Sequence, residues 1–131
     1  MQAKLHKELD AVFGPPSITD DPVLSYEQAK TLPYLDAVIN EGLRLHSTSS
    51  MGLPRLVPSE GLEVLGRTYI EGTVLSVPSY TIHREQRTWG EDVDSFRPER
   101  WFEGDKKDAI SRCFNPYSFG PRCDQILAIV M

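Results

Sequence analysis

Apolar residues recur at helical spacing through the first third of the chain. The first stripe ends at Gly14-Pro15-Pro16 and predicts a helix over about residues 2–13, because glycine and proline are typical of a helix C-terminus. Ser25 with Gln28 three residues later indicates a capping box. A short helix is therefore expected there, ending before Pro33.

The clearest pattern begins at Pro33, a residue suited to the first turn of a helix. One stripe about 100° wide contains Leu35, Val38, Ile39, Gly42, Leu43 and His46. Glu41 and Arg44 lie away from that stripe. As an exposed helical pair they would stabilise the helix by only about 0.3–0.5 kcal/mol.

The middle of the chain changes to a β-type pattern. Residues 62–65, 68–70 and 73–77 are short β-prone runs separated by glycine-containing turns, which predicts a small antiparallel sheet. No regular element is expected over residues 47–55, and a short helix is expected at 80–84. Residues 89–115 show no sustained period and predict a long irregular segment.

Composition narrows the class of protein. The chain has 131 residues, 40% hydrophobic residues and a net charge of -5, which is typical of a small globular domain and gives no basic face for nucleic acid or an anionic membrane. No run approaches the roughly 18 apolar residues of a membrane span. The two cysteines are too few for a disulfide framework, so a reducing compartment is expected. The three histidines lie in unrelated settings and predict no histidine metal site.

Three constellations follow one another in order. They are Glu41-Gly42-Leu43-Arg44, Phe96-Arg97-Pro98-Glu99-Arg100-Trp101, and Tyr117-Ser118-Phe119-Gly120-Pro121-Arg122 with Cys123 adjoining. Together they resemble the E-x-x-R helix, the P-E-R-F/W segment and the heme loop of the cytochrome P450s. The stretches 46–55, 77–84 and 89–92 look closest to the fungal benzoate 4-monooxygenase branch.

The resemblance implies a mainly helical α+β fold over residues 1–131. It would be part of a cytochrome P450 domain, with the J and K helices, a small antiparallel sheet, the meander and the start of the heme loop at about residues 114–125. It also implies heme as cofactor and Cys123 as the axial thiolate ligand of the iron, which favours cleavage of the O–O bond of dioxygen. The other expected cofactor-binding residues are Arg55, Tyr117, Gly120 and Arg122, the two arginines because a guanidinium suits the heme propionates.

Further roles follow from the same resemblance. Arg100 is expected to join Glu41 and Arg44 in a buried network, and Ser50, Met51, Gly52 and Leu53 are expected to border the substrate. Cys113 matches no motif and is expected to pack in the interior. The implied activity is the insertion of one oxygen atom from O2 into a small aromatic or apolar substrate. An NADPH-dependent reductase is the implied partner and the endoplasmic reticulum membrane the implied location.

The heme loop departs from the family pattern. The family places one residue between the arginine and the cysteine and a glycine two residues after the cysteine, whereas Cys123 directly follows Arg122 and precedes Asp124-Gln125. A carboxylate beside the thiol disfavours the thiolate. Two hypotheses therefore stay open: a heme-thiolate monooxygenase, and a truncated, inactive or mis-predicted gene product. No residue of the chain is assigned to proton delivery.

Overall fold

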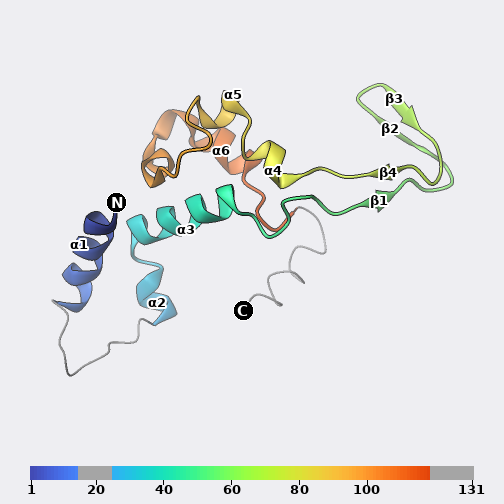
Figure 1. Cartoon of the computed structure of the whole chain (residues 1–131). Helices are drawn as coiled ribbons and strands as arrows, with labels where there is room; N and C mark the ends of the chain where they lie inside the picture. Colours follow the sequence, from blue (N-terminus) through green and yellow to red (C-terminus); the bar gives the residue numbers. More distant parts are fainter. Residues whose placement is uncertain (15–24, 119–131) are drawn as a thin grey trace.

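The computed structural model describes residues 1–14 and 25–118, and its first three helices follow the sequence pattern (Figure 1). Helix α1 is Gln2–Phe13, α2 is Tyr26–Ala29 and α3 is Pro33–Leu45. The capping box of α2 is present, with Ser25 Oγ accepting from the Gln28 amide. These three predictions are confirmed.

The buried face of α3 is not the apolar stripe. The buried residues are Ala37, Glu41 and Arg44. Ile39, from the apolar stripe, is 52% exposed. Glu41 and Arg44 lie off the apolar stripe and are nevertheless buried, because the segment after α5 packs on their side of the helix and saturates the charges with hydrogen bonds.

The antiparallel strands form two ladders and not one continuous sheet. The strands are β1 (Arg55–Leu56), β2 (Leu62–Val64), β3 (Arg67–Tyr69) and β4 (Val74–Leu75). Strand β2 pairs with β3, and β1 pairs with β4. β1 and β4 form a two-stranded ribbon that extends away from the helices and leads into the β2–β3 hairpin (Figure 1).

Local turn chemistry explains this arrangement. Leu65 and Gly66 have φ values of 51° and 75°, as a tight hairpin turn requires. A second turn, closed by the Thr73 amide bonding to the Ile70 carbonyl, redirects the chain after β3. Val57 then exchanges backbone hydrogen bonds with residues 72–73 and fixes the returning strand against β1. Strand β1 was not predicted, since its two residues show no pattern alone.

The second half of the chain is more regular than expected. Short helices α4 (Ser79–Ile82), α5 (Gln86–Trp89) and α6 (Lys107–Cys113) are joined by 3-10 turns at Pro98–Phe102 and Gly104–Lys106. The irregular segment predicted over residues 89–115 thus misses α6. That helix is only two turns long and buries a single residue, Ile110, so its periodicity is too weak to read.

A small apolar core lies among these short helices. Trp89, Val93 and Ile110 are buried, with Trp101, Cys113 and Phe114 packed against them. Cys113 is partly buried, as expected of a packing residue. The mainly helical α+β class is confirmed. Within residues 1–14 and 25–118, no helix combines the length and apolar character needed to cross a bilayer.

Candidate functional site

A fully buried carboxylate organises the centre of the fold. Glu41 Oε1 accepts from Arg44 NH2 and Arg100 Nε, each at 2.9 Å, and from the Arg97 amide at 3.0 Å. Its Oε2 accepts from Arg44 Nε at 3.0 Å and from Trp101 Nε1 at 3.1 Å. Five N–H groups therefore converge on one carboxylate, which satisfies its oxygens away from water.

In addition to Glu41, both buried arginines donate hydrogen bonds to backbone carbonyls. Arg44 NH1 donates to the carbonyls of His83 at 2.8 Å and Val93 at 2.7 Å. Arg100 NH1 donates to the Trp89 carbonyl at 2.6 Å, and its NH2 donates to that of Asp92 at 3.2 Å. The segment between α4 and the first 3-10 turn, which includes α5, is thereby held to α3 through charge-assisted bonds.

The electrostatics of the network favour the ionised form of Glu41. Burial alone raises the pKa of Glu41, but the hydrogen bonds from Arg44, Arg97 and Arg100 outweigh it and hold the pKa below its ordinary value. At the edge of the network around Glu41, the Arg97 guanidinium donates to the carboxylates of Asp92, at 2.6 Å, and Glu103. The Arg97 hydrogen bond lowers the pKa of both carboxyl groups.

The two residues that precede the third motif are bonded to two distant segments. The Asn115 amide donates to His83 Nε2 at 3.0 Å, and the Asn115 carbonyl accepts from Ser79 Oγ at 3.0 Å. The Pro116 carbonyl accepts from Thr48 Oγ1 at 3.0 Å. Sequence reasoning missed His83 and Ser79, because a contact across 32 residues leaves no local spacing signal.

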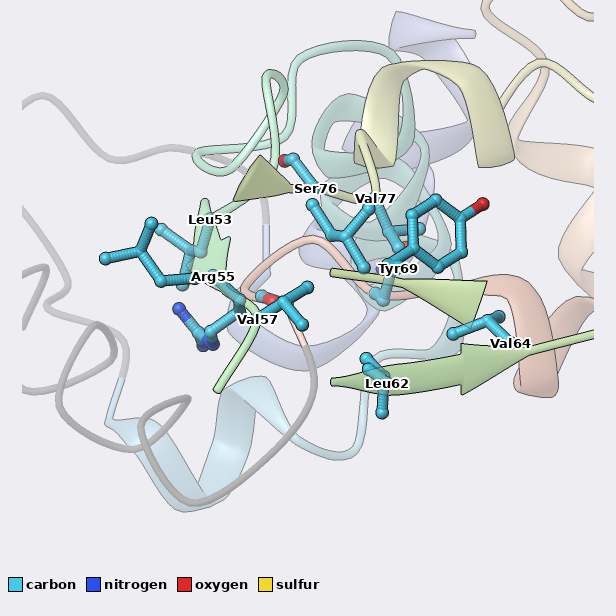
Figure 2. A pocket seen from close by; sticks show the side chains of 12 residues that line it. Leu53, Arg55, Val57, Leu62, Val64, Tyr69, Ser76 and Val77 are labelled. Atoms are coloured by element: carbon cyan, nitrogen blue, oxygen red, sulfur yellow. The ribbon is translucent and has the colours of Figure 1, made fainter. Parts of the chain in front are cut away.

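A cavity of about 540 Å³ opens between the ribbon and this motif. Its walls are mainly apolar, and Arg55, Ser76, Asn115 and Ser118 supply its polar groups. Figure 2 shows Arg55 at one edge of the cavity and Val64 from the hairpin at the other. The volume lies in the range of about 300–1,000 Å³ that is usual for small-molecule and cofactor sites.

Two polar side chains at this cavity have few or no hydrogen-bond partners among the described residues. Among the described residues, the only hydrogen bond of the Arg55 guanidinium is a long one of 3.4 Å to its neighbour Pro54, and no carboxylate pairs with it. Asn115 Oδ1 is buried and has no hydrogen-bond partner within the same residues. An apolar cavity with an available guanidinium suits a ligand that carries carboxylates on a flat apolar body.

The structure separates the expected substrate-lining residues. Leu53 lines the cavity, whereas Met51 is 85% exposed. Ser50 Oγ donates to the Ser47 carbonyl at 2.5 Å. Gly52, with φ of 74°, lies so close to Ser76 and Val77 that a Cβ atom would clash. Of the four, only Leu53 reaches the cavity.

The expected cofactor-binding residues are only partly described. Arg55 is exposed at the cavity edge and Tyr117 is partly buried. Gly120, Arg122 and Cys123 lie outside the described residues. Within the described residues no group of three or more histidine, cysteine or acidic side chains is placed to hold a metal ion.

Comparison with known proteins places the chain in a family. The sequence model of the cytochrome P450 family matches residues 1–123. A benzoate 4-monooxygenase from Aspergillus niger is 45% identical over 121 residues, which are 91% of this chain and 23% of that protein.

Two further relatives agree. A cytochrome P450 monooxygenase from Aspergillus oryzae is 42% identical, over 78% of this chain and 20% of that protein. Another from Alternaria alternata is 37% identical, over 91% of this chain and 32% of that protein. The chain thus spans between a fifth and a third of the length of these relatives. With the three ordered motifs and the buried Glu41 network, these matches show that the chain belongs to the cytochrome P450 family.

Proposed function

We propose that this chain forms the heme-binding end of a monooxygenase that inserts one oxygen atom from O2 into a small aromatic substrate. The cavity beside the third motif, with Arg55 at its edge, carries the proposal. The name of the similar Aspergillus niger protein, a benzoate 4-monooxygenase, supports the choice of an aromatic substrate. The NADPH-dependent reductase, as source of electrons, and the endoplasmic reticulum membrane remain part of this proposal.

The described residues fit heme. Porphyrin is a flat apolar disc with two carboxylates on one edge, so its faces suit side chains such as Leu53, Val57 and Val77, which line the cavity. The Arg55 guanidinium has no competing carboxylate among the described residues and can pair with a propionate. The third motif begins at the same cavity, through Asn115 and Ser118.

The proposal gives each residue a role. Cys123 would supply the thiolate ligand, Arg55 and Arg122 would hold the propionates, and Gly120 and Tyr117 would shape the loop. Heme bound to a thiolate supplies O2 activation. Leu53, the one of the four expected residues that lines the cavity, borders the substrate. The Glu41–Arg44–Arg100 network holds the surrounding backbone in place.

Reconstitution with hemin tests the proposal. The 131-residue chain is mixed with hemin, reduced and exposed to carbon monoxide, and its absorbance spectrum is recorded. We expect the carbonyl band of thiolate-ligated heme, lost in Cys123→Ser and retained in Cys113→Ser, the matched control at the cysteine that packs in the core. Arg55→Gln should weaken hemin binding with the band position unchanged. A spectrum identical to that of free hemin would contradict the proposal.

A second candidate function rests on the spacing of the loop. Cys123 follows Arg122 directly, and a one-residue change moves backbone by about 3.5 Å, far beyond the roughly 0.2 Å that metal ligands tolerate. On this alternative the chain is a family member without heme ligation or activity. Inserting one alanine between Arg122 and Cys123 discriminates: the alternative predicts a thiolate-type band only in the insertion variant.

A further inference from the structure

The backbone of Asn115 is held at its amide and at its carbonyl by the first residue of α4 and the residue that follows α4. Its amide donates to His83 Nε2 and its carbonyl accepts from Ser79 Oγ, each at 3.0 Å. His83 and Ser79 are fully buried and Asn115 is nearly so. The following residue, Pro116, is bonded through its carbonyl to residues 48 and 49. The chain therefore enters its third motif from a fixed peptide.

The hydrogen bonds of His83 define one form of its ring. Nδ1 lies 3.0 Å from the Arg44 carbonyl, which can only accept, so Nδ1 carries a proton. Nε2 receives the Asn115 N–H, so Nε2 carries none. The ring is thus neutral and bridges the C-terminal end of α3 to Asn115. Trp89 and Phe114 pack against it, with ring centroids 5.9 and 5.5 Å away.

We propose that His83, as its Nδ1–H tautomer, is a positioning residue that fixes the entry of the cysteine loop against the end of α3. This positioning role of His83 rests on the function proposed above, because a loop that carries a metal ligand must be placed within tenths of an ångström. A protonated ring would turn an N–H toward the Asn115 N–H, where two donors repel. Arg44 also donates to the His83 carbonyl, so the buried network and the loop entry share one residue.

The surroundings keep the ring neutral. Burial lowers the pKa of His83, and the positive charges of Arg44 on α3 and of Arg84, two residues after α4, add to this effect, against the opposing hydrogen bonds at Arg44 and Asn115. The aromatic neighbours from α5 and from residue 114 carry no charge. The charges thus favour the neutral ring, and the hydrogen bonds place its proton on Nδ1.

NMR spectroscopy of the full 15N-labelled chain tests the inference in two ways. In the unmodified chain, the His83 ring nitrogens should show a protonated Nδ1 and a bare Nε2 at neutral pH. The exposed His46 serves as internal reference, because its ring lies in contact with solvent. An Nε2–H tautomer or an imidazolium at His83 would overturn the inference without any variant.

Two amide variants separate the bonds of the bridge. His83→Gln places an amide oxygen near the position of Nε2 and so keeps an acceptor for the Asn115 amide. His83→Asn is shorter and keeps only a donor near the position of Nδ1, toward the Arg44 carbonyl. We expect Asn115 amide exchange about tenfold faster in His83→Asn than in the unmodified chain and nearly unchanged in His83→Gln. Equal exchange rates in the two variants would mean that His83 acts only by packing, and would overturn the inference.

The hemin experiment on the same samples keeps the two proposals apart. If the Asn115 results are as expected but no thiolate-type band forms, the bridge stands and the proposed function fails. If the band forms while His83→Asn leaves Asn115 exchange unchanged, the function stands and the inference fails. A band that shifts or weakens in His83→Asn and recovers in His83→Gln supports both.

Discussion

The surroundings of Glu41 and the β1–β4 ribbon with its hairpin are stabilised in opposite ways. The side chains of Arg44, Arg100 and Trp101 are bonded to the buried carboxylate of Glu41, and the two arginines are also bonded to backbone. In the ribbon, Val57 is the one buried residue between positions 55 and 77, and Leu65 at the hairpin turn is fully exposed. The first region depends on individual polar atoms, and the second depends on backbone hydrogen bonds and turn conformation.

Glu41→Gln should break the first region most severely. Two buried guanidinium groups would lose their shared carboxylate, at a cost of about 3–5 kcal/mol in the free energy of unfolding. Urea denaturation followed by circular dichroism measures it. The matched variant in the ribbon, Glu63→Gln on exposed β2, should change stability by less than about 0.5 kcal/mol. Similar losses in both variants would remove the contrast.

Acidification should weaken the same region selectively. The pKa of His83 is lowered from 6.5 and that of Glu41 from 4.5 in the folded chain. Because both pKa values are lower in the folded chain, the unfolded chain binds more protons in acid. The free energy of unfolding should therefore be highest above about pH 6.5, decrease below that pH as His83 is protonated in the unfolded chain, and decrease further below about pH 4.5 through Glu41. Denaturation at a series of pH values checks this. Glu41→Gln should abolish the second fall.

Trp101→Phe sharpens the comparison by removing one donor. The aromatic packing on Trp89 and Phe114, with centroids at 5.8 and 4.8 Å, is kept, but the bond from Nε1 to Glu41 is lost. We expect a loss of roughly 1.5–3 kcal/mol, since the acceptor is charged. Tyr69→Phe is the ribbon control, because its hydroxyl makes no hydrogen bond within the described residues. An equal effect of both variants in a urea titration would argue against the role of Trp101.

Glycine substitutions probe the second region. Gly52 and Gly66 have φ of 74° and 75°, so alanine is strained at both. At Gly52 a Cβ atom would also lie 2.5 Å from Ser76 Oγ and 2.6 Å from the Val77 carbonyl oxygen, whereas at Gly66 nothing is near. Gly52→Ala should therefore lower the free energy of unfolding by about 1–3 kcal/mol more than Gly66→Ala. Equal losses would show that the approach of residues 52 and 76–77 relaxes freely.

The parts of the fold that the sequence predicts are those with local signals. Pro33 and the capping box at Ser25 define helix starts, and the glycine turns define the hairpin. Strand β1 and the burial of Glu41 could not be predicted from spacing, because each depends on segments far along the chain. For Glu41, Arg44 and Arg100 it was the family resemblance, and not the pattern, that indicated a network. The cavity-lining role of Leu53 and the bridge at His83 have no local signal.

Helix α3 begins with its capping group supplied from another helix. Its N-cap residue, Leu32, offers no side-chain acceptor, but the Glu8 carboxylate of α1 accepts from the Tyr34 amide at 2.8 Å and the Leu35 amide at 2.9 Å. A helix of this length is marginal in isolation. The first turn of α3 therefore forms cooperatively with the docking of α1, so α1 and α3 should gain and lose hydrogen-exchange protection as one folding unit.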